Sequence, residues 1–385
     1  MRKAFLPASW ETEKLFFDGD DYFESMMTDM DNATQSVTME MYIFEQDPIG
    51  EIFVNKFIAL KRRGIRVQLI VDGVGSYHFF DRYYGLLLEH GIEVKMYNPL
   101  PFYHPQFGNL SFFQKLKLLG IRLWHINKRN HRKITIIDEK ILYTGSYNIT
   151  ADHSSKYNKV AWLDTGVRLT GDAVKFAVLH FKKVWKIKDY FRYKKNLKKQ
   201  YKLNWKRMPL RLNSSVRMRI FLSRDLKQKI KTATSRIWIT TPYFIPTRSF
   251  IKELACAARR GVDVRLLISA KTDVKLFNFL QYFYYPYLLK NGVKVFRYTP
   301  RVLHAKNYIL DDWMILGTTN LNHRSLIHDL EVDTIIGEHD NKLKLAQHFQ
   351  DECAHQPALT KEELKKESLL TRFITSIIFI FRYWM

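Results

Sequence analysis

An internal repeat constrains the fold of this 385-residue chain more than any other feature of its sequence. Residues 61–73 read KRRGIRVQLIVDG, and residues 258–270 read ARRGVDVRLLISA. Each stretch predicts the end of a helix, a terminating glycine and a buried strand. Further strands, rich in β-branched and aromatic residues, are predicted at 36–44 and 235–244 upstream and at 90–99 and 291–300 downstream. The alternation of strands and helices predicts an α/β protein made of two pseudo-symmetric halves, each a mixed sheet flanked by helices.

The repeat places the first half at 1–175 and the second at 220–360, and an insertion interrupts the first half. Pro99 and Pro300 are equivalent in the repeat. Thirty-one residues separate Pro99 from His131, but only 3 separate Pro300 from His304, so the insertion, at about 100–130, adds 31 − 3 = 28 residues. It is rich in aromatic and basic residues.

Two further segments lie outside the repeat. A connector at 176–219 is strongly basic: from Lys182 to Arg219 it holds 15 Lys and Arg but one acid, and aromatic residues are interleaved. A C-terminal tail at 361–385 ends in FITSIIFIFRYWM, which is too short to span a bilayer. This tail is interpreted as an interfacial membrane anchor, with docking on the core as the alternative.

The charge of the chain points to a polyanionic partner. The 62 Lys and Arg exceed the 38 Asp and Glu, which gives a net charge of +24. Such a surface attracts nucleic acid or an anionic bilayer. With only two cysteines, a disulfide framework is excluded.

Each half carries the same polar signature. His131-Arg-Lys133 is followed by Asp138 and, further on, by Gly-Ser146-Tyr-Asn148; His304-Ala-Lys306 is followed by Asp311 and then by Gly-Thr318-Thr-Asn320. The period of a strand predicts that the histidine and lysine of each copy share one face. Two copies at equivalent points of a repeat are a far stronger signal than either copy alone.

These residue types suit the cleavage of a phosphodiester. One imidazole acts as nucleophile while the other donates a proton to the leaving alkoxide. The two lysines and two asparagines stabilise the charge on the phosphoryl oxygens, so neither a metal nor a cofactor is required. Because each copy has one motif histidine and the chemistry needs two, we expect one active site shared between the halves. His153, His323 and His328 lie near the motifs and are interpreted as polar neighbours.

The duplicated HxKxxxxD…G[ST]xN motif resembles that of the phospholipase D superfamily, and the sequence looks most like bacterial cardiolipin synthases from about Leu15 to Ile336. The resemblance implies a phosphohistidine intermediate, with His131 as nucleophile and His304 as acid and base. It also implies that Asp164 and Glu331 orient the histidines, for which solvated surface carboxylates are the alternative. Lys133 and Lys306 belong to the implied catalytic set, and Ser146, Asn148, Thr318 and Asn320 would bind the substrate phosphate. Asp138 and Asp311, also motif residues, are expected to fix the turn geometry.

The resemblance is compatible with three functions, of which two are catalytic and one is binding without catalysis. The favoured one is a phosphatidyltransferase that condenses phosphatidylglycerol with a second phospholipid headgroup. A phospholipase D-type hydrolase, or less favourably a nuclease, is the alternative, and complete motifs in both halves disfavour a non-catalytic binding module. The apolar tail favours a lipid surface over nucleic acid, so we expect peripheral attachment at the cytoplasmic face of the cell membrane. A monomer suffices for the active site, and the oligomeric state is left open.

Overall fold

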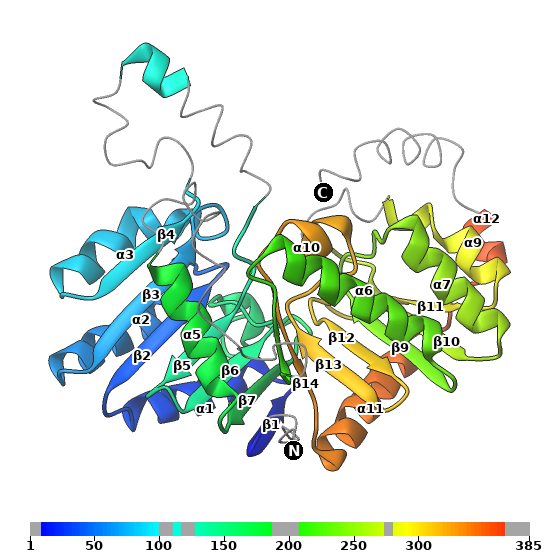
Figure 1. Cartoon of the computed structure of the whole chain (residues 1–385), viewed down its shortest axis with the longest axis horizontal. Coiled ribbons are helices and arrows are strands. Elements are labelled where there is room, and N and C mark those ends of the chain that lie inside the picture. Colours follow the sequence, from blue (N-terminus) through cyan, green and yellow to red (C-terminus); the bar gives the residue numbers. More distant parts are fainter. Residues whose placement is uncertain (1–8, 100–110, 117–127, 187–207, 273–279, 366–385) are drawn as a thin grey trace, which may run out of the picture.

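Two seven-stranded mixed sheets lie side by side in the structure, a computed structural model that describes residues 9–99, 111–116, 128–186, 208–272 and 280–365 (Figure 1). In each sheet three neighbouring strands are parallel and the other four are antiparallel. The first sheet has the order β1 (Thr12–Phe16), β7 (Gly166–Thr170), β6 (Ile141–Gly145), β5 (Ile134–Ile137), β2 (Ser36–Met41), β3 (Arg66–Asp72) and β4 (Glu93–Tyr97). The second has the order β11 (Lys294–Tyr298), β10 (Asp263–Ser269), β9 (Arg236–Thr241), β12 (Asn307–Leu310), β13 (Trp313–Gly317), β14 (Val332–Ile335) and β8 (Leu210–Leu212). When the second sheet is read from β8 to β11, each of its strands corresponds in turn to a strand of the first sheet, read from β1 to β4. This correspondence confirms the predicted pseudo-symmetric α/β fold.

Helices flank both sheets, and their ends follow the sequence signals. Asp18 and Asp47 accept hydrogen bonds from backbone N–H groups at the starts of α1 and α2. Gly64 and Gly261, the predicted terminators of the repeat, adopt φ of 80° and 90° after α2 and α7. The helices of the first half are α1 (Gly19–Asp31), α2 (Pro48–Arg62), α3 (Tyr77–Glu89), the 3₁₀ helix η2 (Ala151–His153) and α5 (Val174–Trp185). Those that follow are α6 (Val216–Thr232), α7 (Arg248–Arg259), α9 (Tyr285–Lys290), α10 (His323–Ile327), α11 (His339–Ala354) and α12 (Lys361–Lys365).

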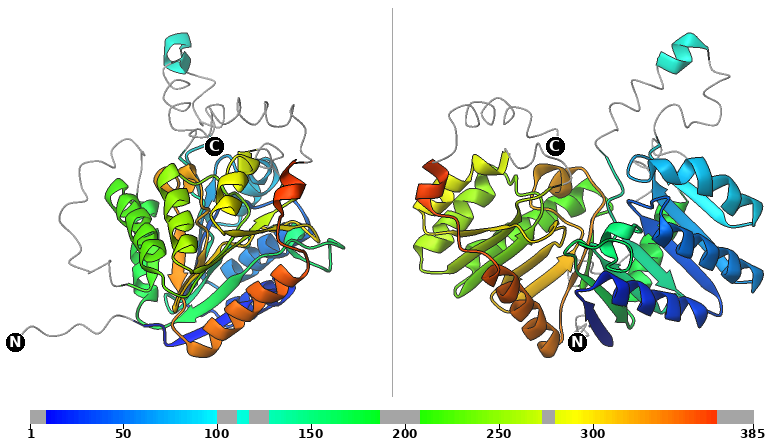
Figure 2. Two further views of the ribbon diagram at one scale, coloured as in Figure 1. Left: turned by 90° about the vertical axis from the view of Figure 1, so that its right-hand side faces the viewer. Right: turned by 180° about the vertical axis from the view of Figure 1, so that it is seen from behind.

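Among the described residues, three clusters of buried apolar side chains form the core. One lies under α1–α3 in the first half, and another under α7 and α9 in the second. The third belongs to both halves, because residues such as Ile134 and Leu142 join Leu316 and Phe349 in it. Helix α11 lies against the second sheet, as Figure 2 shows, and one of its ends approaches the first sheet, so that it contacts both β11 and β1. The shared cluster therefore fixes the two sheets against each other, and with them the motif segments.

Much of the expected insertion, connector and tail falls outside the described residues, at 100–110, 117–127, 187–207 and 366–385. The described ends of the connector belong to α5, β8 and α6. Across the part of the chain that is described, no helix combines the length and apolarity needed to cross a bilayer.

Asp138 and Asp311 close the turns that follow β5 and β12. The Asp138 carboxylate accepts hydrogen bonds from the backbone N–H groups of Thr34, Gln35 and Ser36 at 2.8–2.9 Å. Asp311 accepts from the equivalent residues before β9, at 2.8–3.0 Å. Both have positive φ, at 52° and 53°. The two aspartates tie a hairpin turn to the loop before a neighbouring strand, which is the structural role expected of them.

This arrangement predicts that Asp311→Ala destabilises the fold while sparing the chemistry. The substitution leaves three backbone N–H groups without their acceptor and forces alanine into a left-handed conformation. We expect a loss of about 1–3 kcal/mol in the free energy of unfolding, measured by urea denaturation. Asp312→Ala, one residue away on the exposed side of the turn, is the control and should change stability little. A normal unfolding curve for Asp311→Ala with abolished turnover would contradict the structural role.

Candidate active site

The two motif segments cross from their own half to the other just before their strands begin. The sequence pattern placed His131 and Lys133 on a strand, but β5 begins only at Ile134. The reason is that the backbone N–H of His131 donates to the carbonyl of Leu330 in the other half, at 3.0 Å. His304 donates in the same way to the carbonyl of Leu163, at 2.8 Å. Each histidine therefore lies beside the residue that precedes the other half's carboxylate.

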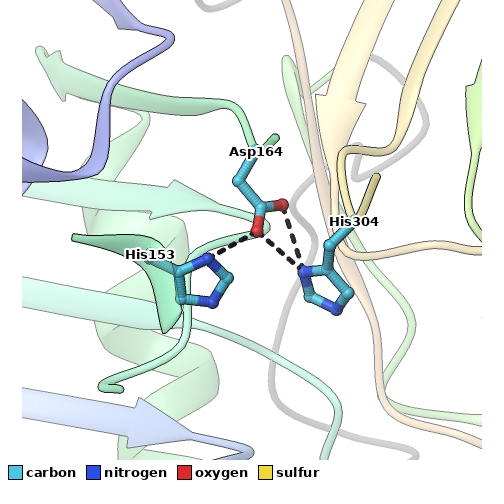
Figure 3. Close-up of side chains that lie close together, drawn as sticks. All are labelled: His153, Asp164 and His304. Atoms are coloured by element: carbon cyan, nitrogen blue, oxygen red, sulfur yellow. Dashed lines mark hydrogen bonds and ion pairs between the residues drawn. The ribbon is translucent and has the colours of Figure 1, made fainter. Parts of the chain in front are cut away.

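The carboxylates are exchanged between the halves. Nδ1 of His131 lies 2.9 and 3.1 Å from the two carboxylate oxygens of Glu331, a residue of the second half. Nδ1 of His304 lies 2.9 and 3.1 Å from those of Asp164, a residue of the first half (Figure 3). All four side chains are buried. This geometry supports the orienting role predicted for Asp164 and Glu331, and neither is a solvated surface carboxylate. With Nδ1 engaged, each imidazole has Nε2 left for chemistry.

Two buried lysines accompany the histidines. Nζ of Lys133 donates to the carbonyl of His131 at 3.0 Å, and Lys306 donates to the carbonyl of His304. Lys133 interacts electrostatically with Lys306 and with both exchanged carboxylates, and both lysines act on His131. The ring of Tyr42 lies 5.0 Å from Nζ of Lys133 and contacts His131 edge-on. The two copies of the motif therefore converge on one site, as the sequence predicted.

The second part of each motif follows β6 and β13. A Cβ atom on Gly145 would lie 2.4 Å from the carbonyl oxygen of Thr165, and one on Gly317 would lie 2.3 Å from that of Val332, so only glycine fits at both positions. Asn148 and Asn320 are buried, and each has an amide atom with no hydrogen-bond partner among the described residues, Nδ2 and Oδ1 respectively. Nδ2 of Asn148 is a donor that suits an anionic ligand, whereas Oδ1 of Asn320 is an acceptor.

The two motif hydroxyls already have protein partners. Ser146 bonds to the backbone of Thr165, and Thr318 bonds to the backbone of Val332 and to the Glu331 carboxylate. The expectation that both hydroxyls bind a substrate phosphate stays a prediction. In this structure they align β7 and β14, and Thr318 also orients Glu331.

Burial and mutual repulsion weaken the protonated form of the basic groups. Burial lowers the pKa of Lys133 to about 7, with the charge of Lys306 contributing. Burial also lowers the pKa of His131, and Lys133 and Lys306 lower it further. Burial raises the pKa of Glu331 to about 7, against hydrogen bonds from Thr318 and Ser325. A bound phosphodiester would bring a negative charge close to these basic groups and would favour their protonated forms. The crowding of basic groups therefore favours the binding of an anion.

One group of described side chains could offer three ligand atoms to a metal ion: His153, Asp164 and His304, whose nearest donor atoms lie within 4.8 Å of one another (Figure 3). The bond from His304 to Asp164 repeats the distances of the His131–Glu331 pair, where no second histidine is present. Hydrogen bonding to the carboxylate therefore accounts for the place of His304, and a close contact of Nδ1 with the same carboxylate accounts for that of His153.

Several buried charges around the site were missed in the sequence. Arg132 bonds to the carbonyl of Glu331 and lies 3.5 Å from the Glu40 carboxylate. Asp329 accepts from the backbone N–H of Arg129, and burial raises its pKa to about 7. These groups brace the segments that carry His131 and Glu331. A charged residue inside an apolar strand, as Glu40 is in β2, was the signal that could have found them.

The comparisons with known proteins agree with this geometry. The family model described as "Cardiolipin synthase, PLD-like domain" matches residues 26–172 and 226–355. A cardiolipin synthase of Staphylococcus aureus is 30% identical, over 94% of this chain and 71% of that protein. A cardiolipin synthase 2 of Bacillus anthracis is 29% identical, over 97% of this chain and 71% of its own. The chain therefore belongs to the cardiolipin synthase family of phospholipase D-like enzymes, which confirms the resemblance drawn from the motifs.

Solved structures show the same fold. A phosphatidylserine synthase of Haemophilus influenzae superimposes with a TM-score of 0.68 at 14% identity, over 98% of this chain and 94% of that one. A polyphosphate kinase of Porphyromonas gingivalis superimposes with a TM-score of 0.58 at 10% identity, over 89% of this chain and 50% of its own.

The lowered pKa of Lys133 predicts that binding of a phosphate-like anion takes up a proton. Tungstate keeps its charge above neutral pH, so a change in its affinity there reports on the protein. The bound anion raises the pKa of Lys133, so affinity should fall as the pH rises above about 7, by up to about tenfold per pH unit from this lysine, until the pKa of the bound state is reached. Isothermal titration calorimetry at pH 6, 7, 8 and 9 measures this. Lys133→Met binds more weakly and should have a shallower slope, because Glu331 and Asp329 still titrate near pH 7; an unchanged slope would contradict the assignment to Lys133.

Proposed function

We propose that this member of the cardiolipin synthase family transfers a phosphatidyl group from phosphatidylglycerol to the headgroup hydroxyl of a second phospholipid. The observation that carries the proposal is the pair of buried imidazoles, each oriented by a carboxylate from the other half and accompanied by a buried lysine. The names of the relatives, which are cardiolipin synthases, support the choice of substrate class.

In the first step Nε2 of His131 attacks the phosphorus of phosphatidylglycerol. The bond from phosphorus to the glycerol headgroup oxygen breaks, and His304 gives its proton to that oxygen, so free glycerol leaves. Glu331 holds the Nδ1 proton of His131 and stabilises the positive ring of the phosphohistidine. Lys133, Lys306 and the asparagine amides stabilise the charge on the phosphoryl oxygens.

In the second step the acceptor hydroxyl replaces glycerol. His304, now neutral, removes the proton of that hydroxyl, and the resulting oxygen attacks phosphorus. The bond between phosphorus and Nε2 of His131 breaks, which regenerates both histidines. Asp164 supports His304 in both steps because it stabilises the protonated ring without taking its proton.

Hydrolysis is the second candidate, because water can replace the acceptor at the same site. Water is abundant in any open site, so transfer requires that the acceptor is held and water is excluded. The net charge of +24 favours an anionic bilayer as the place of reaction, where acceptor headgroups are concentrated. We propose peripheral attachment at the cytoplasmic face of the membrane on this ground.

The products decide between transfer and hydrolysis. With phosphatidylglycerol vesicles we expect cardiolipin and glycerol, identified by mass spectrometry of the lipids, and added glycerol should drive the reaction backwards. His131→Ala and His304→Ala should each lower kcat by at least about a thousandfold. The double variant should be little worse, because the two histidines act as a unit. Phosphatidic acid as the dominant product at every lipid density would identify a hydrolase instead.

A further prediction is that turnover does not depend on a metal ion. The two lysines supply the positive charge that a cation would otherwise bring to the phosphoryl oxygens. Initial rates on phosphatidylglycerol vesicles should therefore survive exhaustive dialysis against EDTA and then against a stronger chelator of zinc. A loss of activity that Zn²⁺ or Mg²⁺ restores would show that a metal takes part. Chelated His304→Ala protein provides the background rate.

A further inference from the structure

The two halves differ in the group that assists each exchanged carboxylate. His153 is the fifth residue after Asn148, and Ser325 is the fifth after Asn320, so the two positions are equivalent in the repeat. Ser325 acts on Glu331 as a hydroxyl donor. At the equivalent place, Nδ1 of His153 lies 2.8 Å from Oδ2 of Asp164. One carboxylate is thus shared by an imidazole and hydroxyl groups, and the other is shared by two imidazoles (Figure 3).

His153 is held firmly in this place. Its ring is buried between Tyr147 and Trp162, with ring centroids 5.5 and 5.4 Å away. Its backbone is fixed by α1: a Cβ atom on Gly19 would lie 1.9 Å from the carbonyl oxygen of His153, so only glycine permits this approach. Trp162 also contacts the ring of His304, at 5.6 Å.

The contact of His153 with Asp164 involves one carboxylate oxygen. Nδ1 of His304 lies near both oxygens, whereas Nδ1 of His153 lies 2.8 Å from Oδ2. Nε2 of His153 has no hydrogen-bond partner among the described residues. A lone pair on Nδ1 would face the carboxylate and be repelled, so Nδ1 carries the proton. The positive end of this N–H stabilises the charge of Asp164.

We propose that His153 is a positioning residue for the transfer reaction: by sharing the Asp164 carboxylate with His304, it fixes that carboxylate and weakens its hold on a protonated His304. At Glu331 the hydroxyl groups of Ser325 and Thr318 hold the carboxylate in place of a second imidazole. The two histidines of the site therefore have unequal surroundings, and a protonated His304 gives up its proton more readily than it would without His153. The inference rests on the proposed function in taking His304 as the acid.

The direction of the effect follows from the charges around His304. Burial lowers the pKa of His304, Asp164 raises it, and Lys306 and His153 lower it. The two imidazoles in turn lower the pKa of Asp164 below its usual range, against the effect of burial. Replacing His153 with a side chain that lacks the N–H removes one of the groups that hold the pKa of His304 down, so that pKa should rise. The titratable and charged groups that face the pair are Asp164, Lys306, Lys133, Tyr22 and Tyr147, and the ring of Trp162 packs beside them.

The test compares two leaving groups in the same vesicles. Glycerol needs a proton from His304 in order to leave from phosphatidylglycerol, whereas p-nitrophenolate leaves from phosphatidyl-p-nitrophenol without one. His153→Phe keeps the ring between Tyr147 and Trp162 but removes the N–H. It should move the alkaline limb of kcat/KM for phosphatidylglycerol upward by about half to one pH unit. It should leave the profile for the nitrophenyl lipid unchanged. His153→Asn, whose amide N–H takes the place of Nδ1, should restore the wild-type limb.

The controls separate positioning from packing. His348→Phe replaces a half-buried histidine that stacks on Phe17, remote from the site, and should move neither profile. If His153→Phe melts well below the wild type, His153→Leu is measured in its place. An equal fall in kcat/KM for both lipids at every pH would overturn the proposal, because it would show a packing role only.

A direct measurement makes the inference independent of the reaction. In the tungstate complex, ¹⁵N NMR of labelled histidine follows the titration of His304, assigned by its absence in His304→Gln. Its pKa should be higher in His153→Phe than in the wild type and normal in His153→Asn; equal values in all three would overturn the inference. A wild type that makes no cardiolipin, together with the expected NMR shift, would refute the proposed function and leave the role of His153 intact.

Discussion

The exchange of carboxylates between the halves is the interaction on which the active site depends. His131 needs Glu331 from the second half, and His304 needs Asp164 from the first. The exchange is built on backbone hydrogen bonds, because each motif segment pairs with the residue just before the other half's carboxylate. Small shifts between the sheets would break both pairs at once. The apolar cluster shared by the two halves is therefore a requirement of the chemistry as well as of stability.

Burial gives the site its electrostatic character. Two lysines and two imidazoles lie close together out of water, and two carboxylates partly balance them. A buried charge costs several kcal/mol unless it is compensated, and this is the reason the basic groups have lowered pKa values. A phosphodiester brings the missing negative charge, and the phosphorane-like transition state carries more of it. The buried lysines and imidazoles, whose charges are poorly compensated without the anion, are thus already in place to stabilise the transition state, and little reorganisation is needed during the reaction.

The sequence was sufficient to predict the fold class, because a repeat with strand and helix periodicity has few solutions. It was also sufficient to single out Asp164 and Glu331, but not to show that each serves the other half's histidine. That exchange depends on contacts between residues 140 and 200 positions apart, which no local pattern records. The strand expected at His131 began later for the same reason. His153 was set aside as a polar neighbour, since nothing local distinguishes a histidine in a short 3₁₀ helix from one that reaches a buried carboxylate.

A duplicated site in one chain has a freedom that two identical subunits lack. In a symmetric dimer every substitution near one histidine would be repeated near the other, so both imidazoles would have the same acid strength. In this chain the position equivalent to Asp164 in the repeat is occupied by Glu331, and the position equivalent to His153 is occupied by Ser325. Each difference changes the surroundings of one imidazole alone. At His304 the second imidazole on Asp164 weakens the hold on the proton, so that ring is a stronger acid once it is protonated. Glu331 is instead assisted by hydroxyl groups. The divergence of the two halves therefore gives the two motif histidines different surroundings, which the shared motif alone does not provide.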